Sequence, residues 1–216
     1  MDIENVTWHK EILPKSSESV LNDLDSVISL SQFYLAGGTG LALKYGHCFS
    51  RDFDFFSTKL FDEELLLQKM QGLKNLTIVS KSTTTLHIVL NKINVSFLGY
   101  IYPLLFPKME YRTKAGVIIE VADERDIACM KISAISGRGT RRDFIDLYMV
   151  ARLYGLRELF ELFQQKFSHT PYNNVHVLKS LVYFDDAERE PLPDMRLPLS
   201  WETVKQFLTV EVPRLL

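Results

Sequence analysis

The chain has 216 residues, of which 46% are hydrophobic and 24% are charged, a composition typical of a globular protein with a substantial core. Its net charge of -2 argues against a surface that binds nucleic acid broadly, and no apolar run approaches the length that spans a membrane. Two cysteines cannot build a disulfide framework, and the polar N-terminus is unlike a secretory signal, so we expect a cytoplasmic protein.

The N-terminal half alternates helical and extended patterns. Apolar residues at helical spacing predict helices over residues 16–30 and 61–70. Between them, residues 33–56 predict a short strand, a Gly-Gly-Thr turn, a short helix over 41–45 and a second strand that starts at Asp52. β-Branched residues predict further strands at 76–80, 85–90, 93–99 and 117–121.

The C-terminal half changes to helical periodicity throughout. The predicted helices cover 126–135, 141–154, 156–167, 175–183 and 201–212. We therefore predict an α+β fold in which residues 1–122 form a mixed β-sheet core with flanking helices. Residues 123–216 would form a helical region that packs on this core and contributes to the site.

Two acidic residues, Asp52 and Asp54, alternate with Phe53 and Phe55 in the second strand. Alternate side chains of a strand share a face, so both carboxylates point one way and both rings point into a core. Neighbouring carboxylates repel each other unless a cation lies between them, and Mg²⁺ is usually held by one or two carboxylates plus substrate phosphates. The pattern predicts a Mg²⁺ site, although a polar strand face exposed to water shows the same alternation.

The glycines that precede the short helix, Gly37 and Gly38, favour an anion site. Without Cβ atoms the backbone can approach a ligand closely, and the N–H groups at a helix N-terminus attract negative charge. An ordinary turn followed by a helix cap at Thr39 is the alternative, and both can hold at once. A phosphate-binding turn beside two carboxylates is the arrangement that nucleotidyl transfer uses.

Residues 37–56, GGTGLALKYGHCFSRDFDFF, resemble the AbiEii/AbiGii toxin family of minimal nucleotidyltransferases, which has a polymerase-beta-like core. The shared signature is Gly-Gly-Thr, then Gly-His and Ser, then Asp-hydrophobic-Asp. A second block, which runs from Asp126 through Lys131 to Leu147, is also similar to this family. The resemblance covers residues 30–155 and implies a nucleotidyltransferase-like sheet.

The resemblance assigns roles to the first block. Its two strand aspartates would bind the metal that bridges a nucleoside triphosphate. The β- and γ-phosphates would be held by Gly37, Gly38 and Thr39, with help from Ser50.

In the second block, the resemblance implies that Lys131 contacts nucleotide phosphate, whereas its apolar neighbours also fit a lysine that extends into water. Asp143 and Asp146 share a face of the next predicted helix, and the resemblance makes one of them a base or a lysine-orienting residue; we favour Asp143. Two alternatives stay open: Asp143 completes a capping box with Thr140, and Asp146 pairs with Arg142.

Arg138 and Arg142 belong to a basic loop before that helix. Such clusters usually face water, but beside a nucleotide pocket they would hold phosphates of the triphosphate or of an RNA acceptor. Polymerase-like cores usually carry a third carboxylate on a later strand, where this chain has Asn94 and Ser96. Neither side chain is itself a general base.

We therefore predict a Mg²⁺-dependent nucleotidyltransferase that moves a nucleotide from a nucleoside triphosphate to an acceptor hydroxyl. The resemblance implies the toxin of a bacterial toxin–antitoxin or abortive-infection system, with a cognate antitoxin protein as partner and with transfer RNA as the acceptor in some members. Two other hypotheses stay open. One is a nucleotide-binding or interaction module without catalysis, and the other is transfer of a nucleotide onto a protein side chain.

Overall fold

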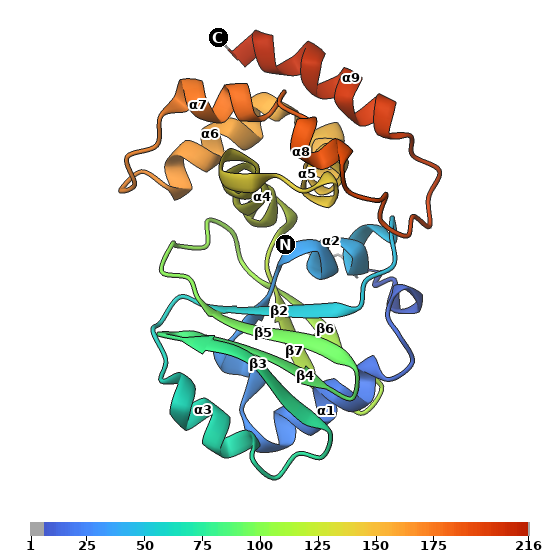
Figure 1. The fold of residues 1–216 in the computed structure, drawn as a ribbon, viewed down its shortest axis with the longest axis vertical. Helices are drawn as coiled ribbons and strands as arrows, with labels where there is room; N and C mark the ends of the chain where they lie inside the picture. The colour runs from blue at the N-terminus through green and yellow to red at the C-terminus, as the bar shows by residue number, and fades with distance from the viewer. Residues whose placement is uncertain (1–6, 216) are drawn as a thin grey trace. The chain divides into compact units, whose positions relative to one another are not determined.

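A computed structural model describes residues 7–215, which divide into two compact units (Figure 1). The first unit contains the chain up to Gly46 together with Ser50–Pro103 and Pro107–Ala122. The second contains everything from Asp123 onward and also two short segments, His47–Phe49 and Leu104–Phe106. The protein is a mixed α/β fold, as the sequence predicts.

The first unit is built on a seven-stranded sheet with the strand order β3-β4-β5-β2-β1-β7-β6. The sheet is mixed because β2 runs parallel to β5 and β1 parallel to β7, while the other neighbours are antiparallel. The sequence pattern did not predict β6. The strands are β1 (Tyr34–Leu35), β2 (Asp52–Ser57), β3 (Leu76–Ser82), β4 (Thr85–Leu90), β5 (Ile93–Gly99), β6 (Met109–Arg112) and β7 (Ile118–Val121).

Helices η1 (Lys10–Ile12), α1 (Ser17–Val27), η2 (Leu30–Gln32), α2 (Gly37–Tyr45) and α3 (Glu63–Met70) accompany this sheet. The predicted boundaries of these helices differ from the observed ones, most of all at α1 and α2. Helix α1 ends at Val27 because Ile28 is already extended, with φ -130° and ψ 142°. Helix α2 begins at Gly37 instead of residue 41, so the Gly-Gly-Thr sequence is its first turn and not a separate turn.

Strand β2 shows why the sheet has one apolar and one polar face. Phe53 and Phe55 are buried, while Asp52 and Asp54 are half-buried on the opposite face, which confirms the predicted alternation. The ring of Phe55 stacks on Phe97 of β5, with ring centroids 5.5 Å apart. Burial of these rings fixes the register of β2 and therefore the face on which both carboxylates lie.

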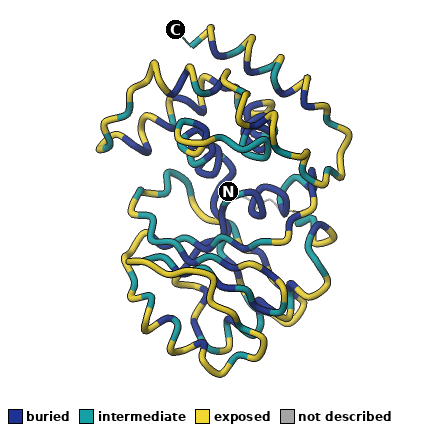
Figure 2. Tube along the Cα trace, in the orientation of Figure 1, coloured by how far each residue is buried: buried dark blue, intermediate teal, exposed yellow. Residues whose placement is uncertain are grey.

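The second unit is helical. Its central helix is α4, which contacts α5, α6 and α7, and the buried positions run along α4 and α5 in Figure 2. Within residues 7–215, no helix is both long and apolar enough to cross a membrane. The helices are α4 (Glu124–Arg138), α5 (Arg141–Tyr154), α6 (Leu156–Lys166), α7 (Asn174–Ser180), α8 (Asp185–Glu188), α9 (Trp201–Glu211) and η3 (Val212–Leu215).

Backbone hydrogen bonds explain why two short segments belong to this unit although the predicted boundary placed them before residue 123. The N–H of Phe49 donates to the carbonyl of Asp194 at 2.8 Å, and the N–H of Arg196 donates to the carbonyl of His47 at 2.9 Å. The N–H groups of the other segment, at Leu105 and Phe106, donate to the carboxylate of Asp126. These long-range contacts are invisible in local sequence patterns.

Candidate nucleotide and metal site

The polar face of the first unit's sheet brings together the side chains of β2 and β5. Asp52 lies in register with Asn94, and Asp54 lies in register with Ser96. The side-chain amide of Asn94 donates to Oδ1 of Asp52 at 2.8 Å. The two positions where a third carboxylate was expected therefore lie directly beside the aspartate pair, and one of them holds an aspartate oxygen in place.

Gly37 lies against Asp54 at the start of α2. A Cβ atom on Gly37 would lie 3.1 Å from Oδ2 of Asp54, and the φ angle of Gly37 is +65°, in the left-handed region that favours glycine. The carboxylate of Asp54 is thus placed next to the first turn of α2, where the N–H groups have no acceptor within the helix. Those N–H groups stabilise negative charge on the carboxylate and on any phosphate bound beside it.

The hydroxyl groups of Thr39 and Ser50 connect α2 to β2. Thr39 Oγ1 donates to the backbone carbonyl of Asp52 and lies 2.6 Å from Ser50 Oγ, so the Ser50 hydroxyl donates to Thr39. Both residues are buried. Their side chains therefore fix the first turn of α2 relative to the aspartates.

The residues of this site fit Mg²⁺. Asp52 and Asp54 supply hard carboxylate oxygens on a partly exposed face. A Cβ on Gly37 would lie 3.1 Å from Oδ2 of Asp54, so the absence of a side chain lets the start of α2 approach this carboxylate closely.

The predicted lysine of the second unit, Lys131, is buried between two acids of α5. Its Nζ lies 2.7 Å from Oδ1 of Asp143 and 2.8 Å from Oδ2 of Asp146. Burial lowers the pKa of Lys131, but the carboxylates of Asp146 and Asp143 outweigh burial and raise it. The ammonium therefore stays charged, and the alternative in which this side chain extends into water is wrong because Lys131 is only 8% exposed.

Both acids of α5 orient this lysine. Asp143 also completes the capping box with Thr140, the alternative raised from the sequence, so one carboxylate serves the helix start and the lysine together. Asp146 is fully buried and has a partner that helical spacing did not indicate. Its Oδ1 lies 2.9 Å from Nε2 of His47, a residue 99 positions away in the chain.

His47, Cys48 and Asp146 offer three ligand atoms that all lie within 4.8 Å of one another. Burial lowers the pKa of His47, but the hydrogen bond to Asp146 and the interactions with Cys48 outweigh it and raise the pKa to about 9. Burial raises the pKa of Asp146, whereas Lys131 and His47 hold it below its usual range. Together with Lys131, these side chains form a buried network of hydrogen bonds and ion pairs.

Of the two predicted arginines, Arg142 lies beside this network. Arg138 is the last residue of α4 and is exposed, while Arg142 is half-buried in the first turn of α5 with Nη2 4.0 Å from the Cys48 sulfur. The structure thus gathers the predicted residues into two groups. Lys131, Asp143 and the arginines belong to the second unit, and the glycine turn, Thr39, Ser50 and the aspartates belong to the first.

Sequence reasoning missed His87 of β4, which lies opposite Ser96 on the antiparallel partner strand. Its Nδ1 lies 3.0 Å from Ser96 Oγ. The signal was present in the sequence, because a two-residue turn at Asn91-Lys92 sets the register of the hairpin, and both residues adopt the positive φ that such a turn requires.

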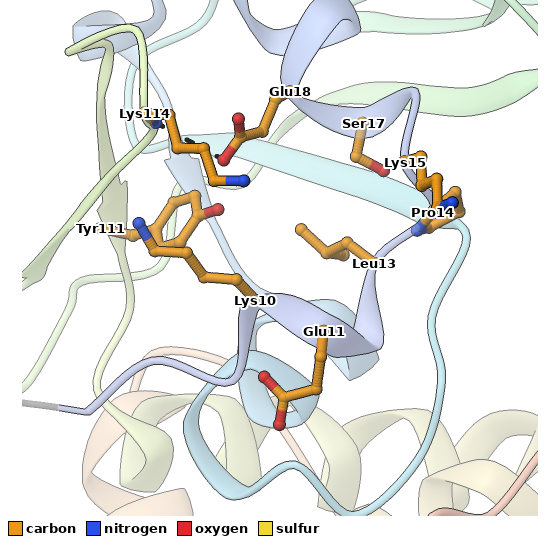
Figure 3. Close-up of a pocket in the computed structure, with 9 residues that line it drawn as sticks. All are labelled: Lys10, Glu11, Leu13, Pro14, Lys15, Ser17, Glu18, Tyr111 and Lys114. Carbon is orange, nitrogen blue, oxygen red and sulfur yellow. Dashed lines mark hydrogen bonds between the residues drawn. The ribbon is translucent and has the colours of Figure 1, made fainter.

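A separate cavity of about 720 Å³ lies in the first unit, between η1, the start of α1 and β6 (Figure 3). Lys10, Lys114 and Glu18 line it together with two hydroxyl groups, those of Ser17 and Tyr111. Both hydroxyl-bearing residues are 1% exposed, and neither hydroxyl has a hydrogen-bond partner among the described residues. No residue that the sequence assigned to the nucleotide site lines this cavity.

Comparisons with known proteins show the family to which the chain belongs. The model of the family described as "Nucleotidyl transferase AbiEii toxin, Type IV TA system" matches residues 89–214. The chain is 40% identical over 196 residues to the uncharacterized protein aq_aa25 of Aquifex aeolicus (strain VF5), a match that covers 88% of this chain and 92% of that protein.

Two solved structures are similar in fold. MenT4, the nucleotidyltransferase toxin Rv2826c from Mycobacterium tuberculosis H37Rv, has a TM-score of 0.53 at 17% identity, covering 91% of this chain and 82% of that one. JHP933 from Helicobacter pylori has a TM-score of 0.51 at 16% identity, covering 94% and 93%. At these identities the likeness shows the fold alone.

Proposed function

Because the chain belongs to the AbiEii nucleotidyltransferase toxin family, we propose that it transfers a nucleotide from a nucleoside triphosphate to an acceptor hydroxyl with the help of Mg²⁺ held by Asp52 and Asp54. The family is one of type IV toxin–antitoxin systems, so an antitoxin is the implied biological partner. For the acceptor we propose an RNA hydroxyl, with transfer RNA as the first candidate.

The observation that carries this proposal is the approach of Asp54 to Gly37. Two carboxylates on one face of β2 would repel each other without a cation, and Gly37 lets the start of α2 approach Asp54 closely. A triphosphate bound there brings negative charge to the N–H groups of the helix and oxygen ligands to the same cation.

Each residue of the first unit then has a defined task. The backbone N–H groups of Gly37, Gly38 and Thr39 bind the terminal phosphates. The Thr39–Ser50 hydrogen bond holds this turn against β2. Mg²⁺, when bound, neutralises charge on the phosphates and on the leaving pyrophosphate.

For the second unit we propose a phosphate-binding role for Lys131. Its two carboxylate partners keep the ammonium charged and hold it in one position, which a lysine that stabilises a developing phosphate charge requires. We assign Asp143 and Asp146 to positioning this lysine. Arg138 is exposed and Arg142 half-buried, and we propose that they contact phosphates of the nucleotide or of the RNA.

Incubation of the purified chain with each nucleoside triphosphate, labelled at the α-phosphate, tests the proposal. The reactions contain Mg²⁺ and either total RNA, purified transfer RNA or a protein extract. Label on RNA supports the proposal, whereas label confined to the protein extract supports transfer to protein. Calorimetric binding of a triphosphate without label in any reaction would indicate a binding module.

Asp54→Asn is the decisive variant, since it keeps the size of the side chain and removes its charge. We expect transfer to fall by at least about 100-fold. Asp186→Asn, an identical change at an exposed residue of α8, is the matched control and should transfer at the wild-type rate. Full activity of Asp54→Asn, with folding verified by thermal unfolding, would refute the metal assignment.

A further inference from the structure

The hydroxyl of Ser96 and the imidazole of His87 form a hydrogen-bonded pair on the polar face of the first unit's sheet. Ser96 Oγ and His87 Nδ1 are 3.0 Å apart, and both residues are half-buried. A serine within hydrogen-bond reach of a histidine is the usual arrangement of an activated oxygen nucleophile.

The pair lies in line with the proposed metal site. Ser96 of β5 is in register with Asp54 of β2 on one side and with His87 of β4 on the other. All three residues point to the same face, because in-register neighbours of a sheet share their orientation. Gly37 continues the row beyond Asp54, so the order across the sheet is phosphate-binding turn, aspartate, serine and histidine.

We propose that Ser96 is itself a nucleotide acceptor, with His87 as its base, so that the chain nucleotidylates its own β5 strand. This inference rests on the proposed function, since it uses the same nucleoside triphosphate. Ser96 Oγ forms a bond to the α-phosphorus, and the bond from that phosphorus to the bridging oxygen breaks. Pyrophosphate leaves with the electron pair, and the serine proton passes to Nδ1 of His87.

The environment of the pair favours this role over a plain cross-strand contact. Histidine is the residue that most often removes a proton near neutral pH, and Ser96 occupies one of the two positions where a third carboxylate was expected. The other position, Asn94, donates to Asp52 and cannot accept a nucleotide in this way. Ser96 therefore lies in register with Asp54, one of the two proposed metal-binding acids, and has a base of its own.

The product would also regulate the enzyme. A nucleotide esterified to Ser96 adds a phosphate charge next to Asp54, and the attached group would occupy the face on which a new triphosphate binds. We therefore expect the modified chain to bind nucleoside triphosphate at least about 10-fold more weakly than the unmodified chain, a loss of roughly 1.4 kcal/mol.

Intact-protein mass spectrometry tests the inference without knowledge of an external acceptor. The chain is incubated with each nucleoside triphosphate and Mg²⁺ in the absence of RNA, and the adduct is mapped by fragmentation of the β5 peptide. We expect one added nucleoside monophosphate on Ser96. Ser96→Ala should carry none, whereas Ser82→Ala, an exposed serine on β3, should be modified as the wild type is.

His87→Gln separates a base from a structural partner, because glutamine can still hydrogen-bond to Ser96 but cannot take up its proton. We expect this variant to bind Mg²⁺ and triphosphate with wild-type affinity by calorimetry and to form the adduct at least about 100-fold more slowly. Adduct formation at the wild-type rate in His87→Gln would overturn the assignment of the base.

The outcomes distinguish this inference from the proposed function. Label on RNA without an adduct on Ser96 would overturn the inference and leave the transferase proposal intact. An adduct mapped to any other residue would also overturn it. Failure of the wild type to bind triphosphate with Mg²⁺ at all would overturn both. The inference and the proposed function are both supported if the wild type forms an adduct on Ser96 and His87→Gln forms it more slowly.

Discussion

The Cα atom of Gly37 and the carboxylate of Asp54 are so close that a side chain at Gly37 would lie 3.1 Å from Oδ2 of Asp54. Gly37 therefore meets two requirements, one of backbone conformation and one of space. Its φ of +65° lies in the left-handed region, and its missing Cβ leaves space beside a proposed metal ligand. Asp54 of β2 and the start of α2 at Gly37, which are 17 positions apart in the chain, therefore lie side by side.

Replacement of this glycine should damage both stability and binding. Gly37→Ala forces an L-residue into the left-handed region, which costs roughly 1–2 kcal/mol, and pushes Cβ against the Asp54 carboxylate. We expect a lower free energy of unfolding in urea and at least about 10-fold weaker Mg²⁺-triphosphate binding by calorimetry. Gly72→Ala is the control, since a Cβ there meets no atom within 4 Å. Wild-type binding by Gly37→Ala would contradict the proposed site.

The imidazole of His47 should make stability depend on alkaline pH. Its pKa is about 9 in the folded chain, above the ordinary value of 6.5, so folding favours the protonated form. The resulting stability is fully present below pH 6.5 and is lost as the pH rises through 9, with a total of at most roughly 3 kcal/mol. Urea unfolding measured from pH 6 to pH 10 should show this fall.

His47→Gln should lose that pH dependence and be less stable at pH 7, because the buried Asp146 loses a charged partner. His169→Gln, a change at an exposed histidine of the same unit, should unfold with the wild-type pH profile. If the unfolding free energy of His47→Gln still fell between pH 6 and pH 10, the hydrogen bond from His47 to Asp146 would not be the source of the pH dependence.

The buried Lys131 is expected to be essential for the stability of the second unit. Lys131→Met removes the cation that pairs with two carboxylates, so the fully buried Asp146 loses one of its charged partners and keeps His47. Breaking one side of such a pair costs about 3–5 kcal/mol. Lys179→Met, at an exposed position of α7, should change the unfolding free energy by less than about 0.5 kcal/mol. A similarly small change for Lys131→Met would show that the triad does not stabilise the fold.

Two tyrosine substitutions test the cavity beside β6. Tyr111 is buried without a hydrogen-bond partner for its hydroxyl, and burial, together with the nearby Glu18, raises its pKa to about 12. Tyr111→Phe removes a desolvated hydroxyl and should leave the thermal stability unchanged or higher. By contrast, the Tyr154 hydroxyl donates to Oε1 of Glu124 at 2.7 Å, so Tyr154→Phe should lose about 1.5–3 kcal/mol. Equal losses of stability in the two variants would mean that the Tyr111 hydroxyl has a hydrogen-bond partner in solution.

The sequence by itself determined that the two carboxylates of β2 lie on one face of the strand and its two buried rings on the other. Alternation of aspartate and phenylalanine places Asp52 and Asp54 together because the side-chain period of a strand is two, and no tertiary contact is needed to see it. The helical periodicity after residue 123 and the capping box at Thr140 are likewise local patterns. The resemblance carried by residues 37–56 pointed to the family that the comparisons confirm.

Only the tertiary structure decided which distant groups meet. His47 and Asp146 are 99 residues apart, and the parallel pairing of Asp54 with Ser96 joins two strands separated by a long connection. Local spacing holds no information about such contacts, because they depend on how the chain returns to the sheet or the helix. Burial of Lys131 is decided in the same way, since its charge is tolerated only where two carboxylates of another helix surround it.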